Sequence, residues 1–370
     1  MHTGIGTGGW QTRGLARGTV SLDPTRGVSV LGAAAAVKVA CLVIAGLAAA
    51  PSSAVSGLAA RVSAAGALRA VAGDAGTGVA AGAGVLWWST PTHLVWHPAL
   101  GVDSALTYTA VVKAGGRYLA SAEDGSVWIS ADAEGKSFSR RATAAAHPLR
   151  AVAQVVGGAA LVAVGDSGTI ARCADLNGVI WTTLVSPVTA HLRGIAFNGM
   201  SAVAVGDSGT VLRAGSPGTE WKVVAIDETT DLLAVTTDPP PGLVGRYLAV
   251  GRDGAVWRGE GDGLTWTRLD GFTTGALHGA AWIGPSAVVV GEAGAIYWSP
   301  GAFESWVPVV SGVTTSLRAV ALAGAELLAI GTDGTVLWSP KLDGREWRRA
   351  EVPVPVRQVS WGGVKQMFRR

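Results

Sequence analysis

The chain has 370 residues, of which 49% are hydrophobic and only 15% charged, and so low a share of charge argues against an intrinsically disordered protein. Glycine fills 53 positions without a Gly-X-Y period, which excludes collagen; the two cysteines and six scattered histidines exclude a disulfide scaffold, a Cys-rich zinc site and a zincin. Lys and Arg total 29 against 26 Asp and Glu, but residues 1–54 hold four of the basic groups and one acid, so the rest of the chain is neutral and lacks the electrostatic footprint of a nucleic-acid-binding protein.

Residues 1–54 have the layout of a secretory signal peptide. Three arginines precede an apolar run over 28–50 that only Lys38 interrupts, and small residues up to Ala54 follow it. An apolar run of about 20 residues also spans a bilayer, so an uncleaved anchor and an organelle targeting segment stay open as alternatives. We therefore expect an extracytoplasmic protein (periplasmic, secreted or luminal) in which residues 55–67 form a linker.

One sequence motif recurs after the linker with a period of about 41 residues. It begins with an apolar pair around Arg, continues as a Val-rich strand that ends in a Gly–acid–Gly turn, and closes with a second strand and a Trp. The copies cover residues 68–96, 108–138, 149–181, 192–221, 232–266, 277–306 and 317–347.

Two residues recur at a nearly constant spacing in all seven copies: a turn glycine precedes a closing aromatic residue by 12 or 13 positions. The turn glycines are Gly84, Gly125, Gly168, Gly209, Gly254, Gly294 and Gly334, and the aromatics are Trp96, Phe138, Trp181, Trp221, Trp266, Trp306 and Trp347. Apolar alternation predicts short strands, and the glycine supplies the positive φ of a tight hairpin. Four strands per copy predict an all-β fold, a seven-bladed β-propeller of four-stranded antiparallel blades over residues 68–361, followed by a basic tail over 362–370.

An eighth copy of the first strand, VRQVSW, lies at residues 356–361. We interpret it as a ring closure that pairs the two ends of the propeller and removes exposed strand edges. It either supplies the inner strand of the first blade or supplements residues 68–72, and the sequence leaves this choice open.

The repeats resemble sialidase-type (Asp-box) repeats and, more closely, the propeller family of photosystem II assembly/stability factors and its bacterial relatives. Residues 160–181 and 202–221 match the family unit best, and the resemblance covers residues 68–361. The Asp box itself is degraded: Ser130 and Asp132 keep its opening, but the following Gly and Phe138 come one place late. The resemblance implies a non-catalytic scaffold for assembly or stabilisation of a membrane-associated complex.

Six acids stand at the glycine turns, namely Asp124, Asp166, Asp207, Asp253, Glu292 and Asp333. Two carboxylates within about 5–10 Å of each other would suit a glycosidase. These acids recur once per blade, however, and Asp commonly closes a turn by accepting hydrogen bonds from nearby backbone N–H groups. We therefore predict a structural role for them.

A basic side chain recurs at the second place of the predicted inner strand, at Arg69, Arg150, Arg193, His278, Arg318 and Arg357, while Thr109 and Leu233 interrupt the series. Equivalent positions on inner strands form a ring around the axis of a propeller. A basic ring suits an acidic peptide or a carboxylate, and the family resemblance favours it because assembly factors of this family carry a basic patch. The alternative is that each Arg packs between blades and pairs with a turn Asp.

A carbohydrate-binding or sialidase-like module is the alternative function. Sialidase chemistry needs a tyrosine nucleophile, and the four tyrosines, Tyr108, Tyr118, Tyr247 and Tyr297, all lie inside repeat strands. The recurrent tryptophans are expected to pack between blades rather than to bind sugars.

We thus expect a monomeric, non-enzymatic propeller without cofactor or metal that binds another protein, and the family resemblance implies that this partner is a membrane-complex subunit. Membrane contact is expected only through the N-terminal segment. The sequence identifies neither the partner nor whether the host is photosynthetic.

Overall fold

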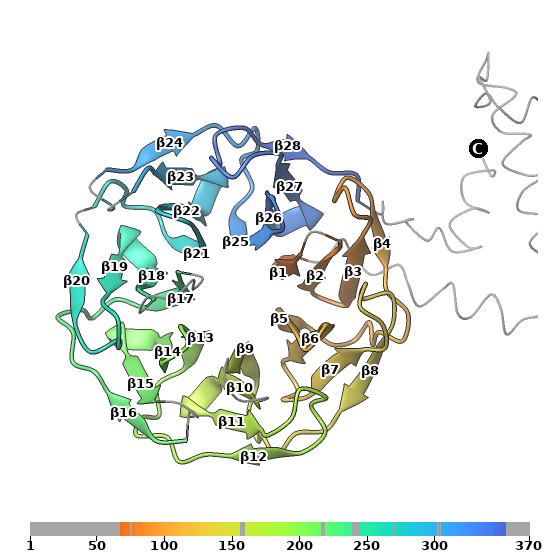
Figure 1. Ribbon diagram of the computed structural model, residues 1–370, viewed down its shortest axis with the longest axis vertical. Helices are drawn as coiled ribbons and strands as arrows, with labels where there is room; N and C mark the ends of the chain where they lie inside the picture. Colours follow the sequence, from red (N-terminus) through yellow and green to blue (C-terminus); the bar gives the residue numbers. More distant parts are fainter. Residues whose placement is uncertain are drawn as a thin grey trace, which may run out of the picture. The chain divides into compact units, whose positions relative to one another are not determined.

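The computed structural model describes residues 67–352 except 75, 156–159, 216–218, 239–244, 270, 302 and 304. This part of the chain forms seven four-stranded antiparallel sheets arranged as the blades of a ring (Figure 1). The predicted all-β, seven-bladed propeller is confirmed. The predicted signal segment over 1–54, the linker up to residue 66 and the basic tail lie outside the described residues.

Each blade is one continuous segment whose four strands pair in chain order. Blades 1 and 2 contain β1 (Leu68–Gly73), β2 (Gly78–Gly82), β3 (Val85–Ser89), β4 (Trp96–Pro98), β5 (Tyr108–Ala114), β6 (Arg117–Ala122), β7 (Val127–Ser130) and β8 (Phe138–Arg141). Blades 3 and 4 contain β9 (Leu149–Val155), β10 (Ala160–Gly165), β11 (Ile170–Cys173), β12 (Trp181–Thr183), β13 (Leu192–Phe197), β14 (Ser201–Gly206), β15 (Val211–Gly215) and β16 (Trp221–Val223). Blades 5 to 7 contain β17 (Leu232–Thr237), β18 (Tyr247–Gly251), β19 (Val256–Gly259), β20 (Trp266–Arg268), β21 (Leu277–Ile283), β22 (Ser286–Gly291), β23 (Ile296–Ser299), β24 (Val307–Val309), β25 (Leu317–Ala323), β26 (Glu326–Gly331), β27 (Val336–Ser339) and β28 (Arg348–Arg349).

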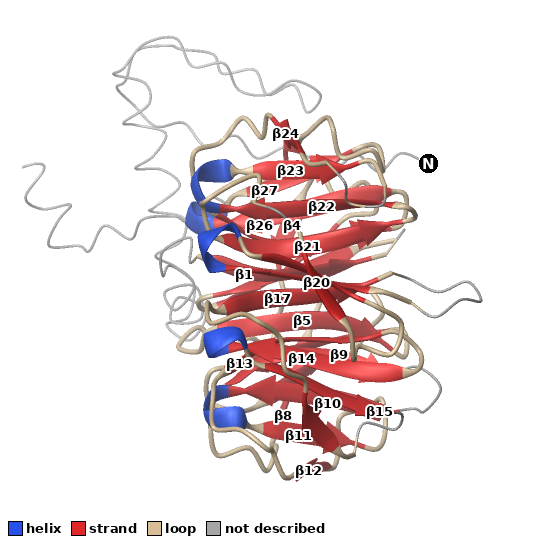
Figure 2. Cartoon of the chain, turned by 90° about the vertical axis from the view of Figure 1, so that its left-hand side faces the viewer, coloured by secondary structure: helices blue, strands red, loops and turns tan. Residues whose placement is uncertain are grey.

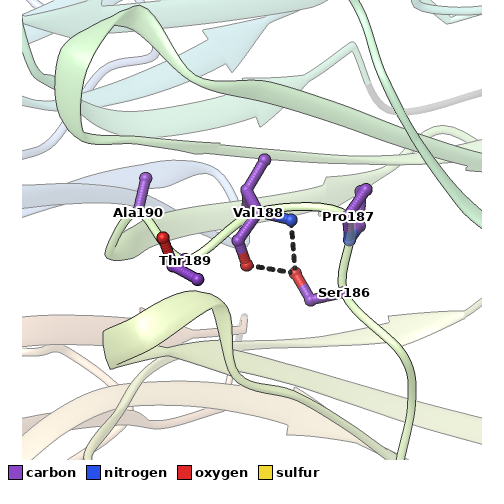
Figure 3. A pocket seen from close by; sticks show the side chains of 5 residues that line it. All are labelled: Ser186, Pro187, Val188, Thr189 and Ala190. Atoms are coloured by element: carbon purple, nitrogen blue, oxygen red, sulfur yellow. Dashed lines mark hydrogen bonds between the residues drawn. The ribbon is translucent and has the colours of Figure 1, made fainter.

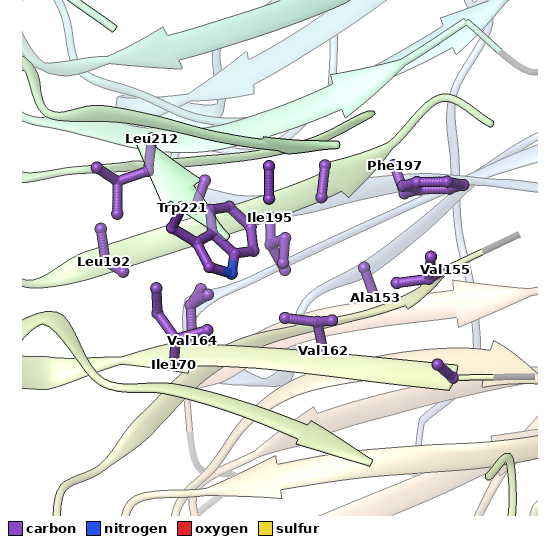
Figure 4. Packing of buried hydrophobic residues seen from close by; sticks show 14 residues of the cluster. Ala153, Val155, Val162, Val164, Ile170, Leu192, Ile195, Phe197, Leu212 and Trp221 are labelled. Atoms are coloured by element: carbon purple, nitrogen blue, oxygen red, sulfur yellow. The ribbon is translucent and has the colours of Figure 1, made fainter. Parts of the chain in front are cut away.

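The core lies between neighbouring blades rather than in one central block. Every residue of β10 and β14 is buried, because a sheet that is covered on both faces needs apolar residues on both. Figure 4 shows one such interface, in which Trp221 of blade 4 packs with Val164 of blade 3 and Ile195. The expected role of the closing tryptophans in blade packing is seen directly here.

The seven turn glycines connect the second and third strand of each blade, and all seven have positive φ, between 65° and 77°. In five blades the turn is a short helical turn, and these are η1 (Asp166–Gly168), η2 (Asp207–Gly209), η3 (Arg252–Gly254), η4 (Glu292–Gly294) and η5 (Thr332–Gly334). All five lie on the same face of the ring, which we call the turn face (Figure 2). Among the described residues, no helix is long and apolar enough to cross a membrane.

Four of the seven closing aromatics share a repeated hydrogen bond. The indole N–H groups of Trp96, Trp181, Trp266 and Trp347 donate to the carbonyl oxygen three residues earlier, over 2.8–3.0 Å. That earlier residue has positive φ in each case, and it is Gly in all but one, where His93 takes its place. The local chain path of the Asp box is therefore kept even where its side chains have changed.

The ring closes where blade 7 meets blade 1, since β25 packs beside β1. At the rim, the backbone N–H of Trp96 donates to Glu351 O (3.1 Å), and the N–H of Glu351 donates to Leu94 O (2.8 Å). β1 occupies the inner position of blade 1, so the reading in which residues 356–361 supply that strand is wrong. Residues 356–361 themselves lie outside the described part of the chain.

Candidate functional site

The seven inner strands share a β-bulge at their second residue. Each begins with a buried residue whose pairing is regular, and the register shifts immediately after it. A bulged residue is left out of the ladder, and its side chain is re-aimed. The bulged residues are Arg69, Thr109, Arg150, Arg193, Leu233, His278 and Arg318, and we call them the axial ring.

The axial ring lies at the turn face, because the first residue of each inner strand is paired with the residue just before the glycine turn or within it. In blade 3, for example, Leu149 pairs with Gly165, which directly precedes η1. The structure thus brings the basic residues that the sequence singled out to equivalent positions around the axis. Arg357, the sixth of them, lies outside the described residues.

Two of the arginines are held by acids of their own blade. Arg150 donates from Nε and Nη2 to the two carboxylate oxygens of Asp166 at 2.8 and 2.6 Å, and its Nη1 lies 3.4 Å from Glu123. Arg193 makes the same two-point contact with Asp207. The hydrogen bond from Arg150 is the main reason why the pKa of Asp166 is lowered, and the same bond raises the pKa of Arg150.

The other basic members of the ring have weaker partners. Arg69 is 45% exposed, and its Nη2 lies 3.7 Å from Glu123 of the next blade. Arg318 is exposed, and its Nη1 approaches Nε2 of His278 at 3.1 Å. Burial, followed by the charge of Arg318, lowers the pKa of His278 to about 4, so His278 is neutral at pH 7.

The six turn acids do not occupy one structural position. The first turn residue in blades 2 to 7 donates its backbone N–H to the residue before the inner strand; these first residues are Glu123, Asp166, Asp207, Arg252, Glu292 and Thr332. Asp124, Asp253 and Asp333 come one place later, and the last two have positive φ. Asp124 accepts a hydrogen bond from the backbone N–H of Ser126 (3.0 Å).

Two charged residues beside the ring are not singled out by the sequence pattern. Glu123 lies between Arg69 and Arg150, and Arg252 pairs through Nε with Asp231 at 2.9 Å. The signal that would have found them is the position two residues before each turn glycine. Counting back from Gly125 and Gly254 gives Glu123 and Arg252, whereas a search for the nearest acid gives their neighbours.

Three of the four tyrosines have a structural role in the blades. Tyr108, Tyr118 and Tyr247 are fully buried, and the last two donate their hydroxyl groups to backbone carbonyls of the preceding blade, at Thr77 and Ser201. Burial raises the pKa of Tyr118 and of Tyr247 to about 12. A buried, hydrogen-bonded phenol is unsuited to attack a sugar, so these three residues do not provide a sialidase nucleophile.

A shallow hollow on the connection between β12 and β13 offers little chemistry. Ser186, Pro187, Val188, Thr189 and Ala190 line it, and the Ser186 hydroxyl is already used within the loop, donating to Val188 O (3.0 Å) and accepting from its N–H (3.3 Å; Figure 3). No group of three or more metal-ligating side chains occurs in the part of the chain that the structure describes. The axial ring is therefore the candidate site.

Comparison with solved structures supports the fold. The chain is similar to YCF48 bound to D1 peptide, with a TM-score of 0.61 and 18% identity over 75% of this chain and 93% of that one. It is also similar to YCF48 from Cyanidioschyzon merolae, with a TM-score of 0.59 and 14% identity over 75% of this chain and 97% of the other. No family model and no curated protein matches the sequence. The resemblance to the photosystem II assembly-factor propellers is confirmed at the level of the fold.

Proposed function

We propose that this protein is an exported, non-catalytic scaffold that binds an acidic segment of another protein at the axial ring. The observation that carries the proposal is the shared bulge, which gathers Arg69, Arg150, Arg193, His278 and Arg318 on one face. A solved propeller of similar fold holds a peptide of another protein, which supports peptide binding as the activity. The partner that fits this reading is a subunit of a membrane-associated complex.

The charge pattern supports an acidic partner. Arginine recognises carboxylates through paired N–H groups, and a ring of such groups around an axis contacts an extended chain at several points. The residues after position 54 are neutral as a whole, so the attraction is local to the ring and weakens with added salt.

The test is crosslinking and affinity capture from native membranes. The triple variant Arg150→Gln, Arg193→Gln, Arg318→Gln is compared with a matched control in which three outer-strand arginines, Arg140, Arg268 and Arg348, are changed to Gln. We expect the ring variant to lose the partner that wild type captures, while the control keeps it. Equal capture by both variants would refute the ring as the binding site.

Export and oligomeric state are part of the same proposal. We propose that residues 1–54 direct the protein across a membrane and that it acts as a monomer. N-terminal sequencing of the protein recovered from the extracytoplasmic fraction tests the first point. Light scattering on the purified protein tests the second.

A further inference from the structure

The axial ring is divided electrostatically into two unlike sides. In blades 3 and 4 the first turn residue is an acid, Asp166 or Asp207, and it holds the arginine of its own blade. In blade 7 the same place is taken by Thr332, and in blade 1 by Ala83, whose N–H makes the corresponding backbone bond to Ala67. Blades 7 and 1 therefore each present an arginine without a carboxylate at the first position of their own turn.

The accessibility of the side chains follows the same division. The side chains of Arg150 and Arg193 are 26% and 34% exposed, whereas that of Arg69 is 45% exposed and Arg318 is also exposed. Since β25 packs directly beside β1, the two accessible arginines belong to adjacent inner strands. Among the described residues, only Nη1 of the Arg318 guanidinium has a hydrogen-bond partner, which is His278.

His278 adds an uncharged hydrogen-bonding group to this side. Three charged groups act on it: Arg318 from blade 7, Glu292 from its own blade and Arg252 from blade 5. Because burial and Arg318 keep the imidazole neutral, it accepts a hydrogen bond from Arg318 and does not repel that arginine. The contact leaves the remaining guanidinium N–H groups of Arg318 available for a two-point contact with a carboxylate.

We propose that the side of the axial ring formed by Arg318, His278 and Arg69 anchors a carboxylate of the bound peptide, and that Arg150 and Arg193 position the ring without contacting it. This inference rests on the proposed function and divides its site. To bind Arg150, a ligand carboxylate has to displace Asp166, which already makes a two-point contact with that arginine. To bind Arg318, it displaces no acid among the described residues. The anchored group is the side chain of Asp or Glu, or the carboxylate at the end of a chain.

Fluorescence anisotropy with three N-terminally fluorescein-labelled decapeptides tests the proposal on the intact protein. The first peptide has two internal Glu and an amidated end, the second has Gln in their place and a free C-terminal carboxylate, and the third has Gln and an amidated end. We expect the third to bind most weakly, and whichever of the first two binds tighter identifies the source of the carboxylate.

Two double variants separate the two sides of the ring. Changing Arg318 and Arg69 to Gln should raise the Kd of the preferred peptide about tenfold or more, since it removes charge-assisted hydrogen bonds to the ligand. Changing Arg150 and Arg193 to Gln should lower the melting temperature but leave that Kd within about threefold. The control, Arg140→Gln with Arg348→Gln, removes the same charge and two ion pairs from outer strands and should leave that Kd unchanged.

The outcomes distinguish this inference from the proposed function. If wild type binds none of the peptides, both are overturned. If wild type binds and the Arg150 and Arg193 variant, still folded by circular dichroism, loses as much affinity as the Arg318 and Arg69 variant, the division of the ring is overturned while peptide binding at the ring stands.

Discussion

A substitution at Gly168, on the turn face, should have a large effect on stability. It ends η1, has a φ of 70°, and sits against the loop that Figure 3 shows, because a Cβ at this position would lie 2.0 Å from Val188 O. The substitution Gly168→Ala therefore meets two obstacles, a left-handed backbone and a backbone oxygen. A control with only the first obstacle exists at Gly116, which has a φ of 77° and no atom within 4 Å of its Cβ position.

The two obstacles can be given magnitudes. A left-handed conformation costs an L-residue about 1–2 kcal/mol relative to glycine, and this is the whole cost expected for Gly116→Ala. At Gly168 the oxygen of Val188 must also move by about 1 Å before the contact reaches an acceptable length, and overpacking of that kind costs a further 1–3 kcal/mol or so. Gly168→Ala should thus lose about 2–5 kcal/mol of unfolding free energy in total.

Guanidinium unfolding, followed by tryptophan fluorescence, measures both variants against wild type. We expect the midpoint of Gly168→Ala to fall clearly below that of Gly116→Ala. If the two variants lose the same stability, the close approach of the loop has no energetic weight, and the argument that the turn glycines are needed for contact as well as for φ is wrong.

Three further predictions concern single residues. Ala293→Gly should stabilise the protein by about 1 kcal/mol, because Ala293 has a φ of 52°, and a melting temperature that falls would contradict this. Trp181→Ala should cost about 3–5 kcal/mol in denaturant unfolding, since the side chain is 6% exposed and its indole is hydrogen-bonded; a loss below about 1 kcal/mol would show that the blade core does not depend on it. His278 takes up a proton near pH 4 when folded but near 6.5 when unfolded, so wild type should lose melting temperature relative to His278→Gln as the pH falls between these values, and parallel profiles would refute the assignment.

Much of the fold was accessible from the sequence because its signals are local and repeated. The turn glycine and the closing aromatic are read directly from the chain, and the structure gives every one of those glycines positive φ. The strand order within a blade follows from short hairpin connections. The packing of Trp221 between blades 3 and 4 could also be predicted, because an aromatic residue recurs at the same position of each repeat, at the start of the fourth strand.

The site was less accessible, because its properties arise from pairing between strands. The basic side chains were found by their place in the repeat, but the bulge that re-aims them depends on register, which no single strand encodes. The choice between a free and a paired arginine depends on the residue two places before the turn glycine. This residue is Asp166 in blade 3 and Thr332 in blade 7, so Arg150 is paired with an acid and Arg318 is not. The difference matters only because the folded chain places the turn beside the inner strand.

The rim contact that joins the last blade to the first has a counterpart elsewhere in the ring. Val95 and Glu351 form an isolated parallel bridge close to the outer strands β4 and β28, and Leu100 and Ser137 form the same kind of bridge between blades 1 and 2. Every sheet is built from one uninterrupted stretch of chain, so no strand has to be exchanged to complete the circle. A circular permutant opened between β4 and β5 should therefore keep all seven sheets whole.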